Sequence, residues 1–113
     1  SRYNLISPHH FVQFLAWMHA QFNCSSEFAA GLPISGIDGT LKDRMDEEAL
    51  KGMVRAKTGT MTGLSSLCGY LTTKDGETLA FSILQNGFTE KESKYKTLIE
   101  DQICSLLVNL TRL

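Results

Sequence analysis

Residues 54–63 read Val-Arg-Ala-Lys-Thr-Gly-Thr-Met-Thr-Gly, and the rest of the chain is organised around them. The stretch opens with a β-like run and predicts a strand over residues 53–60. That strand delivers a Lys-Thr-Gly triplet followed by a hydroxyl residue. Lysine supplies a compact cation, threonine a short hydroxyl donor, and glycine no side chain at all. Held on a strand, they form a wall that can bind a carboxylate and let a ligand lie close to the backbone.

The length and composition indicate a small globular domain. The chain has 113 residues, of which 42% are hydrophobic and 20% are charged. Such a chain forms one domain or part of one, and we expect residues 1–113 to be a single partial domain. The net charge is −1, and the chain has no basic run that would indicate a nucleic-acid partner. Its apolar stretches are far shorter than a membrane span.

The three cysteines are Cys24, Cys68 and Cys104. An odd number leaves at least one thiol free or bonded to another molecule. No pair has Cys-x-x-Cys spacing, which argues against a zinc or redox site, and no metal or cofactor is predicted. Because cysteine prefers protein interiors, buried thiols are favoured over one disulfide.

The first helix is predicted over residues 8–22, with Ser7 as N-cap and Pro8 at the first helical position. Apolar residues recur at three- and four-residue spacing, which indicates one buried face. They are Phe11, Leu15, Met18 and Phe22, with Phe14 and Trp17 widening the face. The histidines on or near this helix are interpreted as surface or cap residues rather than as ligands. They are His9, His10 and His19.

The middle of the chain contains turns and charges. Residues 34–40 form a turn-rich loop with an Asp-Gly pair. Residues 41–52 alternate in charge, and we expect a short, solvated surface helix over residues 46–51 that ends at Gly52.

Two further strands are expected over residues 65–72 and 78–85, joined by the Lys-Asp-Gly-Glu hairpin of residues 74–77. A capping box at residues 89–92 precedes an amphipathic helix that runs from Tyr95 to the C-terminus and lies across the sheet. Its apolar residues are Leu98, Ile99, Ile103, Leu106, Leu107, Leu110 and Leu113. The order helix, loops, three-stranded antiparallel meander and helix predicts an α+β fold.

Four blocks of the sequence together resemble a known family. They are SRYNLISP at residues 1–8, LPISGIDGTL at 32–41, RAKTGT at 55–60 and LCGYL at 67–71. In order and spacing they are similar to the last part of the DacB-type D-alanyl-D-alanine carboxypeptidases, low-molecular-mass penicillin-binding proteins of bacteria. The resemblance implies the β-lactamase/transpeptidase-like fold, in which an antiparallel sheet is backed by the C-terminal helix.

The resemblance also implies an activity and roles for individual residues. Members of the family are serine-type hydrolases that cleave the D-Ala-D-Ala bond of peptidoglycan stem peptides through an acyl-enzyme, which β-lactams also form. By this resemblance, Lys57 places positive charge near the substrate carboxylate and serves the proton network, and Thr58 donates a hydrogen bond to that carboxylate. Gly59 allows close backbone approach, and Thr60 supplies an oxyanion-hole N–H. The family acts in the periplasm.

The family pattern has three motifs, in the order Ser-x-x-Lys, Ser-x-Asn and Lys-Thr-Gly, and this sequence departs from it in the first two. No Ser-x-Asn is present, and the single Ser-x-x-Lys, at residues 93–96, follows Lys-Thr-Gly instead of preceding it. We interpret those four residues as the polar first turn of the last helix. We therefore expect a C-terminal fragment that is inactive alone and needs the N-terminal part of the same enzyme. An uncovered sheet edge and apolar helix face predict that the isolated chain dimerises or is marginally stable.

Two alternatives to an enzyme part remain open. The chain could be a non-catalytic module that binds a peptidoglycan peptide or a partner. It could also be a plain structural α+β domain in which Lys57 is a surface cation.

Overall fold

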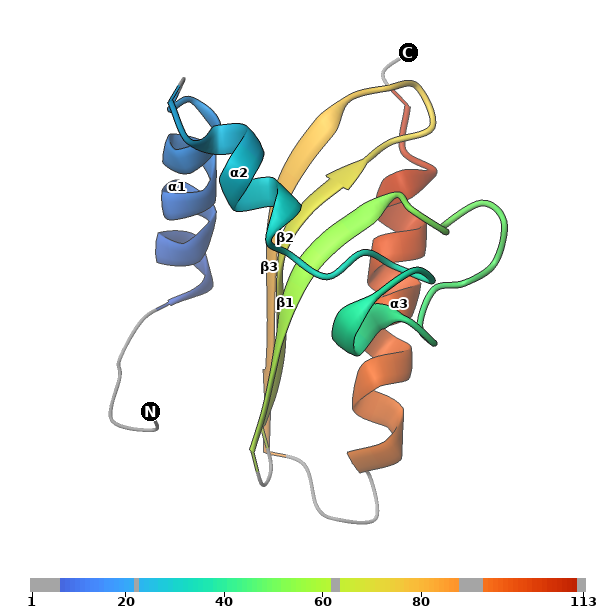
Figure 1. The fold of residues 1–113 in the computed structure, drawn as a ribbon. Helices are drawn as coiled ribbons and strands as arrows, with labels where there is room; N and C mark the ends of the chain where they lie inside the picture. The colour runs from blue at the N-terminus through green and yellow to red at the C-terminus, as the bar shows by residue number, and fades with distance from the viewer. Residues whose placement is uncertain (1–6, 22, 62–63, 88–92, 112–113) are drawn as a thin grey trace.

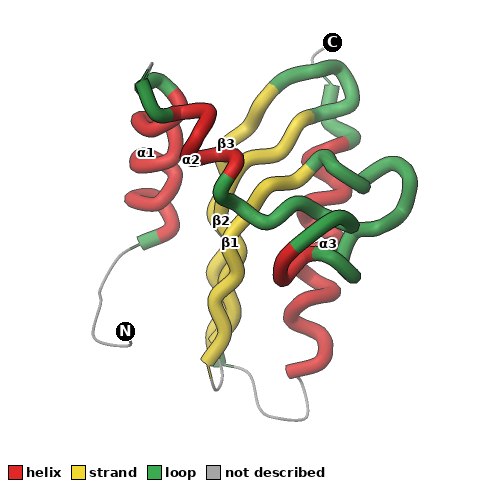
Figure 2. Tube along the Cα trace, in the orientation of Figure 1, coloured by secondary structure: helices red, strands yellow, loops and turns green. Residues whose placement is uncertain are grey.

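The computed structural model describes residues 7–21, 23–61, 64–87 and 93–111. A three-stranded sheet lies between two helical layers (Figure 1). Helices α1 (Pro8–His19) and α2 (Ser25–Ala30) lie on one side of the sheet, and α3 (Ser93–Val108) covers the other (Figure 2). The chain between α2 and the sheet carries the short 3-10 helix η1 (Gly39–Leu41) and passes beside α3. The predicted α+β class is confirmed.

The sheet is an antiparallel meander of strands β1 (Val54–Met61), β2 (Leu64–Thr72) and β3 (Thr78–Asn86), in that spatial order. In its register, Lys57 lies opposite Cys68 and Thr60 lies opposite Ser65. The predicted strands and the Asp-Gly hairpin are therefore confirmed, with strand ends shifted by one residue. The hairpin turns at Gly76, whose φ of 88° is a conformation that glycine adopts without strain.

Side chains alternate between the two faces of the sheet, and those that form the core lie on the face that packs against α3. Buried Val54 and Ala56 of β1 lie on this face together with the buried Leu67 and Leu71 of β2. The opposite face carries Tyr70, whose hydroxyl donates to the Leu15 carbonyl of α1 at 2.5 Å. The core cluster consists of Leu41, Met45, Leu50, Val54, Ala56, Leu67, Leu71, Phe81, Cys104 and Val108.

Helix α1 begins as predicted but ends earlier. The Ser7 hydroxyl accepts a hydrogen bond from the His10 N–H at 3.2 Å, which is the expected N-cap. The helix ends at His19, three residues before the predicted end at residue 22, which lies outside the described residues. Leu15 is its only buried residue, whereas Phe14 and Trp17 of the predicted apolar face are 45% and 58% exposed.

The prediction of a solvated helix over residues 46–51 is wrong. Residues 42–53 form turns, with the Lys51 N–H donating to the Glu47 carbonyl at 2.8 Å. Leu41, Met45 and Leu50 in and beside this segment are buried in the core. The segment is therefore anchored to the core by apolar side chains at irregular spacing, and most of the charged residues between them face solvent as predicted.

Helix α3 buries a different stripe from the one predicted. Glu100, Cys104 and Val108 are buried at four-residue spacing, and Leu98, Leu106 and Leu110 are exposed. The helix begins at Ser93, so the Ser-x-x-Lys of residues 93–96 occupies its first turn, as predicted. The predicted capping box at residues 89–92 lies outside the described residues. No helix in the described parts of the chain is long and apolar enough to cross a membrane.

Candidate active site

The Lys-Thr-Gly triplet lies on β1, at the edge of the sheet, and its side chains leave the strand on opposite faces. Lys57 and Gly59 lie on the α1 side, and Thr58 lies on the α3 side. The exposed Lys57 side chain bends around the edge, and its Nζ donates to the Thr58 carbonyl at 2.7 Å. The Lys57 ammonium therefore lies beside the backbone of Thr58 at the edge of the strand. The expected carboxylate-binding surface is thus formed by the edge of the sheet and not by one of its faces.

This edge of β1 is covered along its first half only. The Ala56 N–H donates to the Pro33 carbonyl at 3.0 Å, and the Ser35 N–H donates to the Val54 carbonyl at 2.9 Å. Since backbone groups alternate in direction along a strand, the N–H and C=O groups of Thr58 and Thr60 face the same side. Within the part of the chain that the structure describes, no strand pairs with β1 there. The second half of the edge is thus open to an extended ligand.

Gly59 lies at a crowded position of this edge. A Cβ atom at Gly59 would lie 2.7 Å from the Ser66 Oγ on β2. The Ser66 hydroxyl itself lies 3.5 Å from the Gly59 carbonyl oxygen. A side chain at this position would displace Ser66, so glycine keeps the backbone of β1 bare and close to β2.

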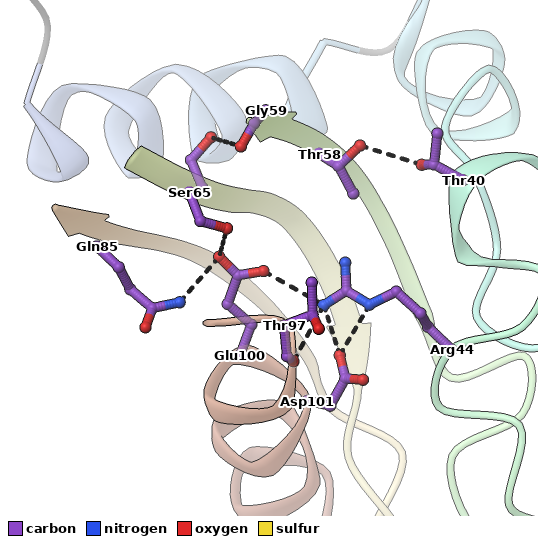
Figure 3. A network of polar contacts seen from close by, with 10 residues as sticks. Thr40, Arg44, Thr58, Gly59, Ser65, Gln85, Thr97, Glu100 and Asp101 are labelled. Carbon is purple, nitrogen blue, oxygen red and sulfur yellow. Dashed lines mark hydrogen bonds and ion pairs between the residues drawn. The ribbon is translucent and has the colours of Figure 1, made fainter. Parts of the chain in front are cut away.

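On the α3 side, the edge is flanked by a second hydroxyl. The Thr58 Oγ1 donates to the Thr40 Oγ1 of η1 at 3.2 Å (Figure 3). The open edge is therefore bordered by the Lys57 ammonium on one side and by two threonine hydroxyls on the other. A cation, hydroxyl donors and outward N–H groups along one strand suit a ligand with a carboxylate and an adjacent carbonyl. The Thr60 side chain lies outside the described part, and only its backbone enters this description.

A group of ion-paired residues lies behind the site, and we call Arg44, Glu100 and Asp101 the Arg44 cluster. The Arg44 guanidinium lies 2.6 Å from the Asp101 Oδ1 and 3.2 Å from the Glu100 Oε1 (Figure 3). It also donates to the Thr97 carbonyl at 3.3 Å. These contacts tie the loop after η1 to α3.

Sequence reasoning missed both Thr40 and the Arg44 cluster. Thr40 was part of a turn-rich loop, and Arg44 belonged to the segment assigned to a solvated surface. The available signal was Leu41 and Met45 beside Arg44, an apolar pair at four-residue spacing that indicates a segment folded onto the core.

Burial affects the titrating groups of this region. Burial raises the pKa of the Cys68 thiol, and the neighbouring Lys57 charge opposes that rise. Burial also raises the pKa of Asp101, although the hydrogen bond and charge of Arg44 act in the opposite direction. All three cysteines are free thiols: Cys24 is exposed, Cys68 half-buried and Cys104 buried.

Comparison with known proteins identifies the family of this chain. The model of the D-Ala-D-Ala carboxypeptidase 3 (S13) family matches residues 1–110. The chain belongs to this family. A D-alanyl-D-alanine carboxypeptidase of Actinomadura sp. (strain R39) is 49% identical over 65 residues, which are 53% of this S13 chain and 12% of that protein.

Solved structures agree with this assignment. Penicillin binding protein 4 (dacB) from Haemophilus influenzae superposes with a TM-score of 0.81 at 30% sequence identity, over 97% of this chain and 26% of that one. Its complex with a novel β-lactam superposes with a TM-score of 0.80 at 29% identity, over 97% of this chain and 27% of that one. The β-lactamase/transpeptidase-like fold of the C-terminal portion is thereby confirmed. The chain spans about a tenth to a quarter of the length of these S13 relatives.

Proposed function

We propose that the full-length protein that contains this chain is a serine-type D-Ala-D-Ala carboxypeptidase or endopeptidase. Its substrate is a peptidoglycan stem peptide that ends in D-Ala-D-Ala, and the reaction proceeds through an acyl-enzyme. The observation that carries this proposal is the Lys57 ammonium at the open edge of β1, in a chain of the S13 family. Because peptidoglycan lies outside the cytoplasmic membrane, the proposed location is the periplasm.

In this proposal the substrate lies along the second half of the β1 edge. The Lys57 ammonium attracts its terminal carboxylate, and the Thr58 hydroxyl donates a hydrogen bond to it. Bare Gly59 lets the peptide approach the strand. The Thr60 N–H then faces the carbonyl oxygen of the scissile bond, where one such donor lowers the barrier by about 3 kcal/mol.

The proposed chemistry is acyl transfer in two steps. A serine from the rest of the protein attacks the carbonyl carbon, the C–N bond breaks, and D-Ala leaves with the serine proton on its amine. Water then attacks the ester, which restores the serine hydroxyl and releases the shortened peptide. A β-lactam acylates the same serine. This chain has no Ser-x-Asn motif and no Ser-x-x-Lys before Lys-Thr-Gly, so we propose that it is inactive alone.

Labelling with a fluorescent penicillin tests the proposal. The full-length protein is expected to be acylated and to release D-Ala from a D-Ala-D-Ala peptide, whereas the 113-residue chain is not. Lys57→Ala is expected to slow acylation by about a hundredfold, the effect of losing a group that acts in the transition state. Lys74→Ala, at an exposed lysine in the β2–β3 hairpin, is the matched control and should leave the rate unchanged.

Two results would contradict the proposal. A full-length protein that is not acylated but still binds the stem peptide would instead be a non-catalytic binding module. If the Lys57→Ala protein kept the wild-type rates of acylation and D-Ala release, Lys57 would have no role in the reaction.

A further inference from the structure

The Arg44 cluster lies behind the Lys-Thr-Gly edge and reaches it by two separate routes. We infer that Arg44 and Glu100, acting through Thr40 and Ser65, are positioning residues for this edge. The inference rests on the proposed function, because it concerns the groups that would hold the substrate. It assigns no substrate contact to Arg44 or Glu100 themselves.

The first route runs through β2. Glu100 is 1% exposed, and its Oε2 accepts hydrogen bonds from the Ser65 hydroxyl at 2.8 Å and the Gln85 amide at 3.1 Å. Ser65 is the cross-strand partner of Thr60, whose N–H faces the open edge. Figure 3 shows the Glu100 carboxylate bound by Ser65 and Gln85. Glu100 therefore fixes the strand that lies directly beside the proposed oxyanion donor.

The second route runs through η1. The Gly36 N–H donates to the carbonyls of both Leu41 and Arg44, each at 2.9 Å, so the turn that carries Thr40 is closed on Arg44. Arg44 in turn is held by the Asp101 and Glu100 carboxylates of α3. A displacement of Arg44 would therefore move Thr40, which is the hydrogen-bond partner of Thr58.

The Thr40–Thr58 pair has a direct consequence for ligand binding. A hydroxyl can donate one hydrogen bond while accepting others. When a carboxylate occupies the edge, Thr40 can donate to Thr58 while Thr58 donates to the carboxylate. Thr40 thus holds Thr58 in the rotamer that presents its proton to the ligand.

The Glu100 carboxylate is better explained by positioning than by stability. A buried ion pair is often matched in stability by well-packed apolar residues, and it is retained where it specifies one arrangement. Glu100 occupies the same buried stripe of α3 as Cys104 and Val108, where an apolar side chain would serve packing alone. Instead, it joins α3, β2, β3 and the loop after η1 at one point.

The test measures penicillin acylation of the full-length protein in two ways. The amount of label at saturation counts folded sites, and the rate constant per labelled site reports the geometry of the edge. A residue that only stabilises the fold lowers the first quantity and leaves the second unchanged. Thr40→Val, Thr40→Ser and Glu100→Gln are compared with wild type, and Thr78→Val, at an exposed threonine of β3, is the matched control.

The rate constant per site is expected to fall roughly tenfold or more in Thr40→Val and Glu100→Gln, because small displacements of positioned groups have effects of this size. Thr40→Ser, which keeps the hydroxyl, should recover most of the rate, and Thr78→Val should match wild type. Because Thr40 is exposed, Thr40→Val keeps the test valid even if Glu100→Gln fails to fold.

The outcomes separate this inference from the proposed function. Wild-type protein that is not acylated overturns both. If wild type reacts and Lys57→Ala is slow, but Thr40→Val and Glu100→Gln keep the wild-type rate per site, only the positioning role is overturned. A rate for Thr40→Ser as low as that for Thr40→Val also overturns it, since the hydroxyl would then be irrelevant.

Discussion

Lys57 and Cys68 lie directly opposite each other on β1 and β2, with both side chains on the α1 face of the sheet. Directly paired residues of antiparallel strands have neighbouring side chains, so the lysine charge acts on the thiol. Burial raises the pKa of Cys68 and Lys57 opposes this rise. Cys68 is consequently a natural probe of the charge at the proposed site.

The first prediction concerns this pair. In Lys57→Ala the opposing charge is lost, so the pKa of Cys68 should rise further, and less thiolate is present at a given pH. The pH midpoint for alkylation of Cys68, followed by mass spectrometry, is expected to move to higher pH. The midpoint is used because it does not depend on steric access. Lys74→Ala should leave it unchanged, and a shift to lower pH in Lys57→Ala would contradict the assigned geometry.

The second prediction concerns Cys104. Burial and the neighbouring Asp101 carboxylate raise the pKa of this thiol to about 12. At pH 8, roughly one Cys104 thiol in ten thousand is then ionised, so alkylation of the folded protein should label Cys24 and spare Cys104. Denaturation should make Cys104 reactive. Rapid labelling of Cys104 under native conditions would show that the interface between α3 and the sheet opens easily.

Gly69→Ala is predicted to be strongly destabilising. A Cβ at Gly69 would lie 2.1 Å from the Arg55 carbonyl oxygen and 2.6 Å from the Ala56 Cα, so β1 and β2 would have to separate. The expected loss in the free energy of unfolding is about 3 kcal/mol, at the upper end for overpacking. Gly76→Ala is the control, because its Cβ meets nothing within 4 Å and costs only the strain of a positive φ. Urea unfolding that shows equal losses would contradict this account.

Arg44→Ala is predicted to destabilise the protein by about 3 kcal/mol, because it leaves the buried Glu100 carboxylate without its cation. Lys42→Ala removes an exposed cation two residues away and should change stability by less than about 0.5 kcal/mol. The free energies of unfolding of both variants are measured by chemical denaturation and compared with that of wild type. Adding Glu100→Gln to Arg44→Ala should restore part of the loss, since the fully buried unpaired charge is then removed and only the partly exposed Asp101 has lost its cation. A double variant less stable than Arg44→Ala would argue against this cause.

Self-association of the isolated chain is the last prediction. Leu106 on the outer side of α3 and Leu110, two residues beyond its end, are 72% and 53% exposed, and exposed apolar side chains favour contact with another chain. Sedimentation is expected to show dimers or larger species. Leu106→Gln should shift the 113-residue chain toward monomer, whereas Gln102→Ala, at an exposed polar position of α3, should not. A compact wild-type monomer that melts cooperatively would contradict the prediction.

Local sequence signals were sufficient for the three strands, for helices α1 and α3 and for the position of the Lys-Thr-Gly triplet, but not for α2, η1 or the turns of residues 42–53. The Asp-Gly hairpin and the alternating strands predicted the meander, and the N-cap Ser7 marked the start of α1, because each depends on residues a few positions apart. The resemblance of residues 1–8, 32–41, 55–60 and 67–71 also indicated the family, because each of these blocks is a run of consecutive residues.

Tertiary structure alone decided how the site is assembled. Glu100 lies on the buried stripe of α3 only because Ser65, Gln85 and Arg44, from three other segments, satisfy its carboxylate. Arg44 looked like a solvated charge because its partners lie 56 and 57 residues away. Long-range pairing of this kind leaves no local periodicity, so the sequence determined what β1 presents, and the fold decided which half of its edge stays open.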